Sequence, residues 1–204
     1  MVELCPRVTT EYKKEKKSQI IRSAIKCFSK YGFDKTRMDD IVNESELSKG
    51  TLYNYFSSKE DLFQAIAEDS LNLLKLQLSN VFVQSKEDVM TNIELAYDEF
   101  RKIQREGSDK VFFEAITESS RNPKLQKILR DHRKKMYKMI YEHIQSQIEK
   151  GWYRDDVDLE LIAAGGVALL DGLTIGKILG IPESYNKKVW IEIHKLIFDG
   201  LNSR

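Results

Sequence analysis

The segment between Lys49 and Lys59 carries the side chains with the clearest chemical purpose. It contains two lysines, a threonine, an asparagine and two tyrosines, and no Asp or Glu follows until Glu60. Ammonium, hydroxyl and amide groups bind phosphate oxygens and base edges, whereas a carboxylate facing phosphate is repelled. Gly50 lets the backbone approach a duplex closely. The segment therefore predicts a DNA-binding surface.

Two short helices are expected to position these side chains. Ser48 can cap a helix from Lys49 to Tyr55, with Leu52 and Phe56 anchoring it at a spacing of four residues. Before it, Thr36 and Asp39 resemble a capping box that opens another helix of about two turns. Two such helices joined by a tight turn have the lengths of a helix-turn-helix, whose second helix enters the major groove.

The rest of the chain is also expected to be helical. Only 10 Gly and 3 Pro interrupt 204 residues, and apolar side chains recur at helical spacing over long stretches. Ser57 and Glu60 resemble a second capping box, and Asp158 is a further N-cap candidate. We predict an all-α fold of about nine helices, with a DNA-binding domain at 1–62 and a second domain at 63–204. The expected helices are 13–31, one of about two turns through Ile41 and Val42, 49–55, 59–80, 85–100, 109–116, 123–150, one capped by Asp158 that holds Leu161 to Leu170, and a last one holding Val189 to Leu201.

Composition and motifs exclude several function classes. The net charge of +1 gives no global attraction to nucleic acid or membrane. The longest unbroken apolar run, Leu161 to Leu170, is half a membrane span, so no membrane partner is expected. Gly172 to Lys177 lacks the spacing of a phosphate-binding loop, and no catalytic motif occurs, so we expect no enzyme, cofactor or metal site. Cys5 and Cys27 form no disulfide framework and no signal sequence is evident, which indicates a cytoplasmic protein.

Positive charge is concentrated near the N-terminus. Residues 1–37 contain ten basic and four acidic side chains, a net +6, which leaves −5 for the remainder. Within this stretch Lys13, Lys14, Lys16 and Lys17 form a run at the start of the first expected helix. Such a run either reaches phosphate or the minor groove beside the helix-turn-helix, or forms a solvated face. The sequence leaves both interpretations open.

At residues 20–63 the sequence resembles the TetR family of transcriptional regulators. The resemblance rests on Ser-Lys-Gly-Thr-Leu-Tyr-Asn-Tyr-Phe at 48–56 and Lys-Glu-Asp-Leu at 59–62. One departure is Glu46, in Ser-Glu-Leu-Ser at 45–48 where most members have Ala-Gly-Val-Ser. Glu46 must therefore adopt a turn conformation that favours glycine.

The resemblance implies which residues contact DNA. The second helix of the motif would face the bases and nearby phosphates, and two helix starts would grip phosphate. The alternatives are core packing for Tyr53 or Tyr55 and simple solvation for the lysines. The implied DNA-binding residues are Thr36, Ser48, Lys49, Gly50, Thr51, Tyr53, Asn54, Tyr55 and Lys59.

For the remaining two-thirds of the chain the resemblance implies a ligand pocket and a homodimer interface. Small residues four apart, Ala164, Ala168, Gly172 and Gly176, form a stripe for close helix packing, and Ile193 and Ile197 of the last helix would join them. The stripe could instead pack within one subunit. Aromatic and methionine side chains suit an apolar pocket, although core packing is their commoner role. The pocket candidates are Tyr97, Phe112, Phe113, Met136, Tyr137, Met139 and Tyr141.

The expected partners are therefore an operator in double-stranded DNA, a second copy of the chain and a small-molecule effector. Repression is expected because family members act mostly by occupying promoters. We interpret the effector as a lipidic molecule such as a fatty acyl coenzyme A, with a drug-like aromatic cation as the alternative. A helical protein-binding module without DNA affinity is the competing function, but it leaves the acid-free segment 49–59 unexplained.

Overall fold

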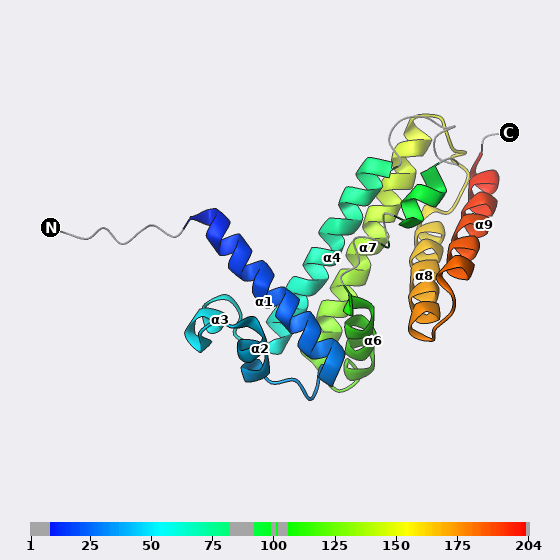
Figure 1. Cartoon of the computed structure of the whole chain (residues 1–204). Coiled ribbons are helices and arrows are strands. Elements are labelled where there is room, and N and C mark those ends of the chain that lie inside the picture. Colours follow the sequence, from blue (N-terminus) through cyan, green and yellow to red (C-terminus); the bar gives the residue numbers. More distant parts are fainter. Residues whose placement is uncertain (1–8, 82–91, 99–100, 102–105, 203–204) are drawn as a thin grey trace. The chain divides into compact units, whose positions relative to one another are not determined.

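The computed structural model describes residues 9–81, 92–98, 101 and 106–202, and this part of the chain is all-α, as predicted. Figure 1 shows the helices in chain order from blue to red. Residues 92–98 form a further helical stretch, whereas the proposed caps Ser85 and Asp88 lie outside the described residues. The labelled helices are α1 (Thr10–Tyr31), α2 (Met38–Ser45), α3 (Lys49–Tyr55), α4 (Lys59–Val81), α6 (Ser108–Glu118), α7 (Pro123–Glu149), α8 (Leu159–Ile178) and α9 (Glu183–Leu201).

Helix ends follow the expected chemistry at several places. Gly32 ends α1 with φ of 81°, a conformation that side chains disfavour, and its N–H donates to Phe28 O at 2.9 Å. Gly151, with φ of 72°, follows the end of α7. At the start of α8 the Asp158 carboxylate accepts from Leu161 N at 3.1 Å. These residues confirm the boundaries expected from glycine and capping positions.

The chain divides into two compact units that are not consecutive in sequence. Unit 1 contains residues 1–66 and 110–126, and unit 2 contains residues 67–109 and 127–204. This division differs from the predicted single domain boundary after residue 62, because most of α6 and the first turn of α7 belong to unit 1. Helices α4, α6 and α7 therefore each belong partly to both units.

Unit 1 is built around a row of aromatic side chains. The ring centroids of Phe28 and Phe33 are 5.1 Å apart, those of Phe33 and Phe63 6.0 Å, and those of Phe63 and Phe112 5.3 Å. These spacings are favourable for aromatic pairs. The row links α1, the loop after it, α4 and α6, so α6 contributes to the core that supports the helix-turn-helix.

Unit 2 has its own core around Trp190 of α9. Tyr97, Leu170 and Leu173 are buried against it, and the indole N–H donates to Ile93 O at 2.9 Å. A buried indole that finds an acceptor costs little to bury. The stretch 92–98, α8 and α9 thus share one apolar core.

Helix α8 is long and apolar enough, by length and composition, to cross a membrane, yet only 22% of its most apolar 18-residue window is buried. Two of its three charged side chains form ion pairs with other helices. Asp171 forms an ion pair with Arg133 of α7, and Lys177 forms one with Asp109 at the start of α6. An exposed apolar surface of this kind is typical of a protein–protein contact.

Candidate nucleic-acid interface

The turn between α2 and α3 is formed by one residue in a left-handed conformation. Glu46 has φ of 56° and ψ of 21°, and it is the single non-glycine residue with positive φ in the described part of the chain. Just before it, Gln19 of α1 donates from Nε2 to Ser45 O at 2.8 Å, which fixes the end of α2. The prediction that Glu46 takes a glycine-like conformation is confirmed.

We expect Glu46→Gly to stabilise the protein by about 0.5–1 kcal/mol. A left-handed conformation costs an L-residue about 1–2 kcal/mol, and the extra freedom of glycine in the unfolded chain offsets part of the gain. Urea denaturation measures the change. The control is Glu44→Gly, the same replacement inside α2, which should destabilise the protein by about 1 kcal/mol. Equal destabilisation by both substitutions would contradict a strained turn.

Helix α3 is fastened on one side and open on the other. Leu52 is fully buried and Phe56 is 5% exposed. At its start Ser48 Oγ accepts from Thr51 N at 3.1 Å, so Ser48 is the predicted N-cap. Lys49, Gly50, Tyr53 and Asn54 are exposed, and Thr51 and Tyr55 are partly exposed. Tyr53 is 42% exposed, so core packing does not describe it.

A carboxylate from α2 lies against α3, although α3 itself contains no Asp or Glu. Lys49 Nζ lies 2.7 Å from Asp39 Oδ1 of α2, and both side chains are more than 60% exposed. This hydrogen bond with Asp39 raises the pKa of Lys49. Sequence reasoning missed the pair because the two residues lie on different helices. Lys49 therefore has a competitor for any phosphate or base that it contacts.

We expect Asp39→Asn to raise affinity for duplex DNA about threefold to fivefold per protomer. The substitution removes a charge that repels phosphate and competes with it for Lys49, and the effect is modest because the ion pair is exposed. Fluorescence anisotropy with a labelled duplex measures the change. Glu44→Gln removes a carboxylate from the same helix, where it pairs with Lys26, and serves as the control. A decrease in affinity for Asp39→Asn would show that the pair orients Lys49 for binding.

A cleft of about 670 Å³ lies beside α3. It is lined by the loop after α1, the first residues of α2, and the side chains of Tyr53 and Lys59. Thr36 belongs to this lining but is only 1% exposed, and its hydroxyl donates to Gly32 O at 2.7 Å and Cys27 O at 3.2 Å. The predicted phosphate contact of the Thr36 side chain is therefore wrong, because that hydroxyl is used inside the protein.

The predicted capping box at α2 is also displaced by one residue. Arg37 N donates to Asp40 Oδ2 at 2.7 Å, so Asp40 and not Asp39 closes the box. This leaves Asp39 free to reach Lys49.

Lys59, which was predicted to contact a phosphate, is hydrogen-bonded to the loop between α1 and α2. Its Nζ donates to Phe33 O at 2.8 Å and to Asp34 O at 2.7 Å, and it lies 5.0 Å from the centre of the Phe33 ring. Two of the three ammonium protons are therefore used to fasten the loop before α2 to the start of α4. The main task of Lys59 in the structure is to position this loop.

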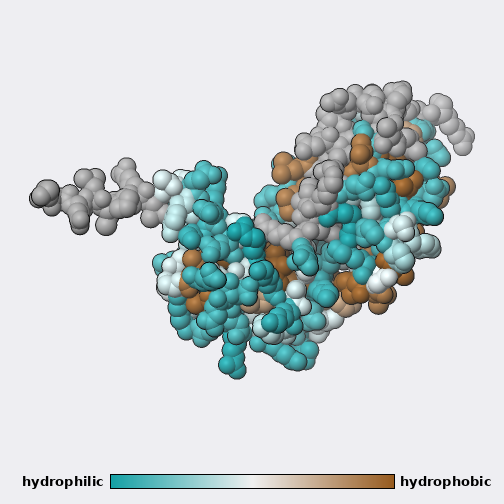
Figure 2. All heavy atoms as spheres, viewed as in Figure 1, coloured by the Kyte–Doolittle hydropathy of each residue, from teal (hydrophilic) through white to brown (hydrophobic). Residues whose placement is uncertain are grey.

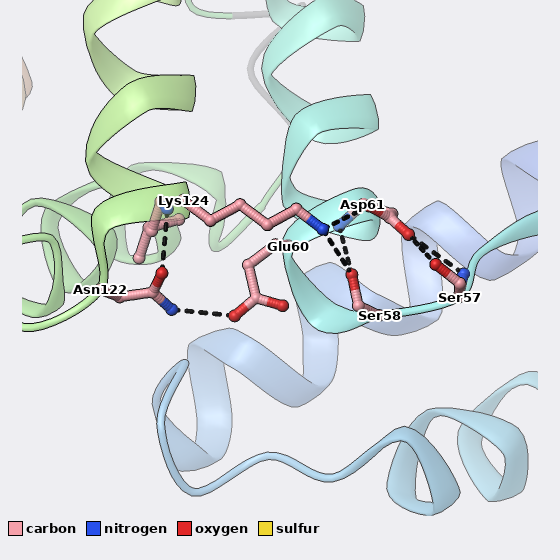
Figure 3. A network of polar contacts seen from close by, with 7 residues as sticks. Ser57, Ser58, Glu60, Asp61, Asn122 and Lys124 are labelled. Atoms are coloured by element: carbon pink, nitrogen blue, oxygen red, sulfur yellow. Dashed lines mark hydrogen bonds and ion pairs between the residues drawn. The ribbon is translucent and has the colours of Figure 1, made fainter.

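The start of α4 is held by a polar network drawn in Figure 3. Ser58 Oγ accepts from Asp61 N at 3.2 Å, so Ser58 and not Ser57 caps the helix. Asp61 in turn accepts from Ser57 N and from Lys124 Nζ of α7. Hydrogen bonds from Ser57 first, and then from Lys124, lower the pKa of Asp61 to about 2. The predicted Ser57–Glu60 box is wrong by one residue.

Glu60 has a different partner in the same network. Its carboxylate accepts from Asn122 Nδ2 at 2.8 Å, and Asn122 Oδ1 accepts from Leu125 N at 3.0 Å as the cap of α7. Figure 3 shows the two helix starts joined by these side chains. The first turn of α7 thereby fixes the first turn of α4 within unit 1.

The seven pocket candidates are divided between the two units. Phe112 packs on Phe63 in unit 1, and Phe113 on the same helix is 41% exposed. Tyr97 is buried in the core of unit 2, with its hydroxyl donating to Glu183. Phe112 and Phe113 therefore belong to unit 1 and the other five candidates to unit 2, and the ligand pocket stays a prediction. The others in unit 2 are Met136, packed on the core, Tyr137, bonded to Arg133, Met139, partly buried, and Tyr141, 37% exposed.

The four residues of the predicted small-residue stripe of α8 do not all face the same side. A Cβ at Gly176 would lie 3.0 Å from Asn186 Oδ1, so Gly176 serves packing on α9 of the same chain, and Ala164 is partly buried. Ala168 and Gly172 are exposed, as is Ile193 of α9, whereas Ile197 is partly buried. We name the exposed apolar set the α8–α9 face: Leu161, Gly165, Ala168, Gly172 and Ile175 of α8, Leu179 directly after it, and Ile193, Leu196 and Gly200 of α9.

Figure 2 shows hydrophilic atoms covering most of the surface around α1 to α3, and hydrophobic atoms reaching the surface near the lower end of α8. Leu161 and Leu179, near the two ends of α8, are 70% and 74% exposed. Gly165, Gly172 and Gly200 have open space where a side chain would stand. The α8–α9 face is therefore flat enough for another backbone to approach.

Comparisons with known proteins agree with this geometry. Residues 20–66 match the family described as bacterial regulatory proteins, tetR family, and residues 99–188 match the C-terminal part of BetI-type transcriptional repressors. The uncharacterized HTH-type transcriptional regulator YfiR of Bacillus subtilis (strain 168) is 32% identical over 153 residues, covering 72% of this chain and 71% of that protein.

Solved structures share the fold over nearly the whole length. A TetR-family transcriptional regulator from Syntrophomonas wolfei has a TM-score of 0.78 at 21% identity, covering 93% of this chain and 97% of that one. A structure described as that of a fatty acid metabolism regulator from Clostridium perfringens has a TM-score of 0.66 at 20% identity, covering 91% and 100%. At these identities the likeness is one of fold.

Proposed function

Because the chain belongs to the TetR family of transcriptional regulators, and is thus no enzyme, we propose that it is a repressor released by a ligand. In this proposal a homodimer binds a palindromic operator in the cytoplasm, and a small apolar effector lowers its affinity for that operator. The match of residues 99–188 to BetI-type repressors supports repression over activation.

The observation that carries the DNA-binding part is the two-sided character of α3. Leu52 and Phe56 fasten the helix, while Lys49, Tyr53 and Asn54 stay exposed on a segment without carboxylates. A recognition helix must keep its polar side chains free for the major groove while its apolar side holds the orientation. We assign base contacts to Thr51 and Asn54, and phosphate contacts to Lys49, Tyr53 and Tyr55, with Ser48 and Gly50 at the helix start.

The α8–α9 face supports the dimer. An isologous interface uses the same surface on both subunits, and two helices from each chain would form a four-helix contact about a two-fold axis. To read two successive major grooves on one side of the duplex, such a dimer must hold its two recognition helices about one DNA turn, roughly 34–36 Å, apart. The operator should then have two-fold symmetry.

The effector is proposed from chemistry alone. The long apolar helices of unit 2 favour a lipidic molecule such as a fatty acyl coenzyme A, and an aromatic cation is the alternative. Mass spectrometry of molecules that co-purify with the protein separates the two. Titration of the acyl coenzyme A with and without operator then tests regulation, because a ligand that weakens DNA binding must itself bind more weakly to the DNA complex.

Genomic fragments selected by the purified protein, followed by footprinting, test the DNA-binding proposal. We expect a symmetric protected site. Thr51→Val should change base preference at one position, whereas Tyr53→Phe should weaken binding to all sequences alike. Asn43→Ala on the exposed side of α2 is the control. Selection of no sequence above background would show that the chain is a protein-binding module.

A further inference from the structure

Helix α1 begins well before the core that it supports. Its first buried residue is Ile20, whereas residues 10–19 are exposed or partly exposed. At 1.5 Å per residue these ten residues extend the helix by about 15 Å. In Figure 1 this part of α1 lies above α2 and α3 and stands apart from them. It is a helical projection that contributes nothing to the apolar core of unit 1.

Charge is divided between the sides of this projection. Lys13, Lys14 and Lys17 are spaced so that they share one helix face, and Glu11 and Glu15 lie together on another. The three lysines are exposed, and within the described structure none of their ammonium groups forms a hydrogen bond or ion pair. Lys16, on a third side, instead donates to Gln19 Oε1 at 3.1 Å and lies 5.5 Å from the centre of the Tyr12 ring.

This arrangement works against the stability of the helix. Lysines near a helix N-terminus oppose the positive end of the macrodipole. Lys13 and Lys17 repel each other at a spacing of four, as do Glu11 and Glu15. A solvated helix would gain from alternating signs at this spacing. Local rules that a sequence breaks in this way are expected where the residues have a function.

The lysine face is aligned with the packed face of α1. Lys17 precedes Ile21, Ala24 and Phe28 at intervals of four, three and four, which is one continuous stripe. Ile21, Ala24 and Phe28 are buried in the core of unit 1. The three ammonium groups therefore lie on the side of the projection that faces the rest of the unit, which carries α3.

We propose that Lys13, Lys14 and Lys17 bind the phosphate backbone of duplex DNA outside the half-site that α3 occupies. This inference rests on the proposed function, because it needs α3 in a major groove. Laid along a duplex, a projection of about 15 Å spans four to five base pairs at roughly 3.4 Å each, and the proposal places it beyond the recognised sequence. The contact adds affinity and salt dependence without adding base specificity.

The test compares two duplexes that contain the same selected operator. One ends at the outer base pairs of the two half-sites, and the other continues for ten base pairs on each side. The test variant carries Lys13→Gln, Lys14→Gln and Lys17→Gln. The matched control carries Lys134→Gln, Lys135→Gln and Lys138→Gln on the exposed side of α7, which gives the same change in net charge.

We expect the test variant to bind the long duplex about tenfold more weakly at 0.15 M salt and the short duplex within threefold of the unmodified protein. On the long duplex the slope of log affinity against log salt concentration should be less steep by up to about 5. Each lost phosphate contact reduces this slope by about 0.9, and a dimer loses three contacts per protomer. The melting temperature should stay the same or rise, because like-charge repulsion is removed.

Equal losses on the two duplexes, or equal losses in the test and control variants, would overturn the assignment of a flanking contact. Equal binding of the unmodified protein to the short and long duplexes would also overturn the flanking contact, but it would leave the proposed function intact. Failure to bind either duplex above random DNA would contradict the proposed function itself.

Discussion

Replacing Ala168 with arginine is expected to convert the protein to a monomer and to weaken operator binding at least about 100-fold. Ala168 lies in the middle of the exposed stripe of α8, between Gly165 and Gly172, where open space allows a second helix to approach. The two-fold axis of an isologous interface brings two copies of the new charge into that contact.

The size of the effect follows from burial of an unpaired charge. An arginine that loses water without gaining a partner costs several kcal/mol, and two copies exceed what a standard interface can absorb. A monomer then presents one recognition helix and loses the linkage between two half-sites, which commonly provides a factor of 100 or more. Analytical ultracentrifugation and anisotropy with the selected operator measure the two consequences separately.

Ser184→Arg is the matched control. Ser184 is exposed on α9 nine residues before Ile193, which places it on the opposite side of that helix. This variant should remain dimeric and bind the operator normally. A dimeric Ala168→Arg protein would show that the α8–α9 face is not the interface, and a monomer with full operator affinity would show that dimerisation is unnecessary for binding.

The helix-turn-helix could be predicted from sequence because its determinants are local. Ser48 caps α3 through Thr51, three residues away, and Leu52 and Phe56 share a helix face. The conformation of Glu46 followed from its place in the turn. Each of these depends on residues within one or two turns of chain, which the sequence displays directly.

The capping boxes failed for a related reason. In both cases a second candidate stood one residue further on, Asp40 after Asp39 and Asp61 after Glu60. Local sequence does not distinguish between them. The choice is made by partners distant in sequence, since Lys49 engages Asp39 and Asn122 engages Glu60.

The sequence could not show which pocket and stripe candidates share surroundings, because neighbouring positions on one helix face different parts of the protein. Met136 packs on the core of unit 2, whereas Phe112 packs in unit 1 because α6 returns to that unit. Gly176 continues the spacing of Gly172, but a straight helix with a repeat of four drifts around its axis and turns Gly176 toward Asn186. Only the packing of the helices reveals which side each residue takes.

Acidification from pH 6.5 to 5 is expected to destabilise unit 2 through its buried histidines. All three histidines of the chain lie in this unit, and burial lowers the pKa of each of them, to about 4 for His132 and His143. The basic neighbours Lys135 and Arg133 lower the pKa of His132 further. Its Nε2 lies 3.0 Å from Ser70 Oγ, a hydrogen bond with α4 within unit 2.

The direction of the effect follows from linkage. The folded protein keeps these rings neutral, whereas the unfolded chain takes up protons near pH 6.5. The free energy of unfolding is therefore unaffected by the histidines above pH 6.5 and decreases as the pH falls toward 4. The loss approaches about 2–3 kcal/mol for His132 and for His143. Between pH 6.5 and 5 few carboxylates titrate, so urea denaturation in this window isolates the histidine contribution. The variant with His132→Gln and His143→Gln should lose much less stability across it, while His194, left in place, accounts for what remains. An unchanged pH dependence in that variant would assign the acid sensitivity to other groups.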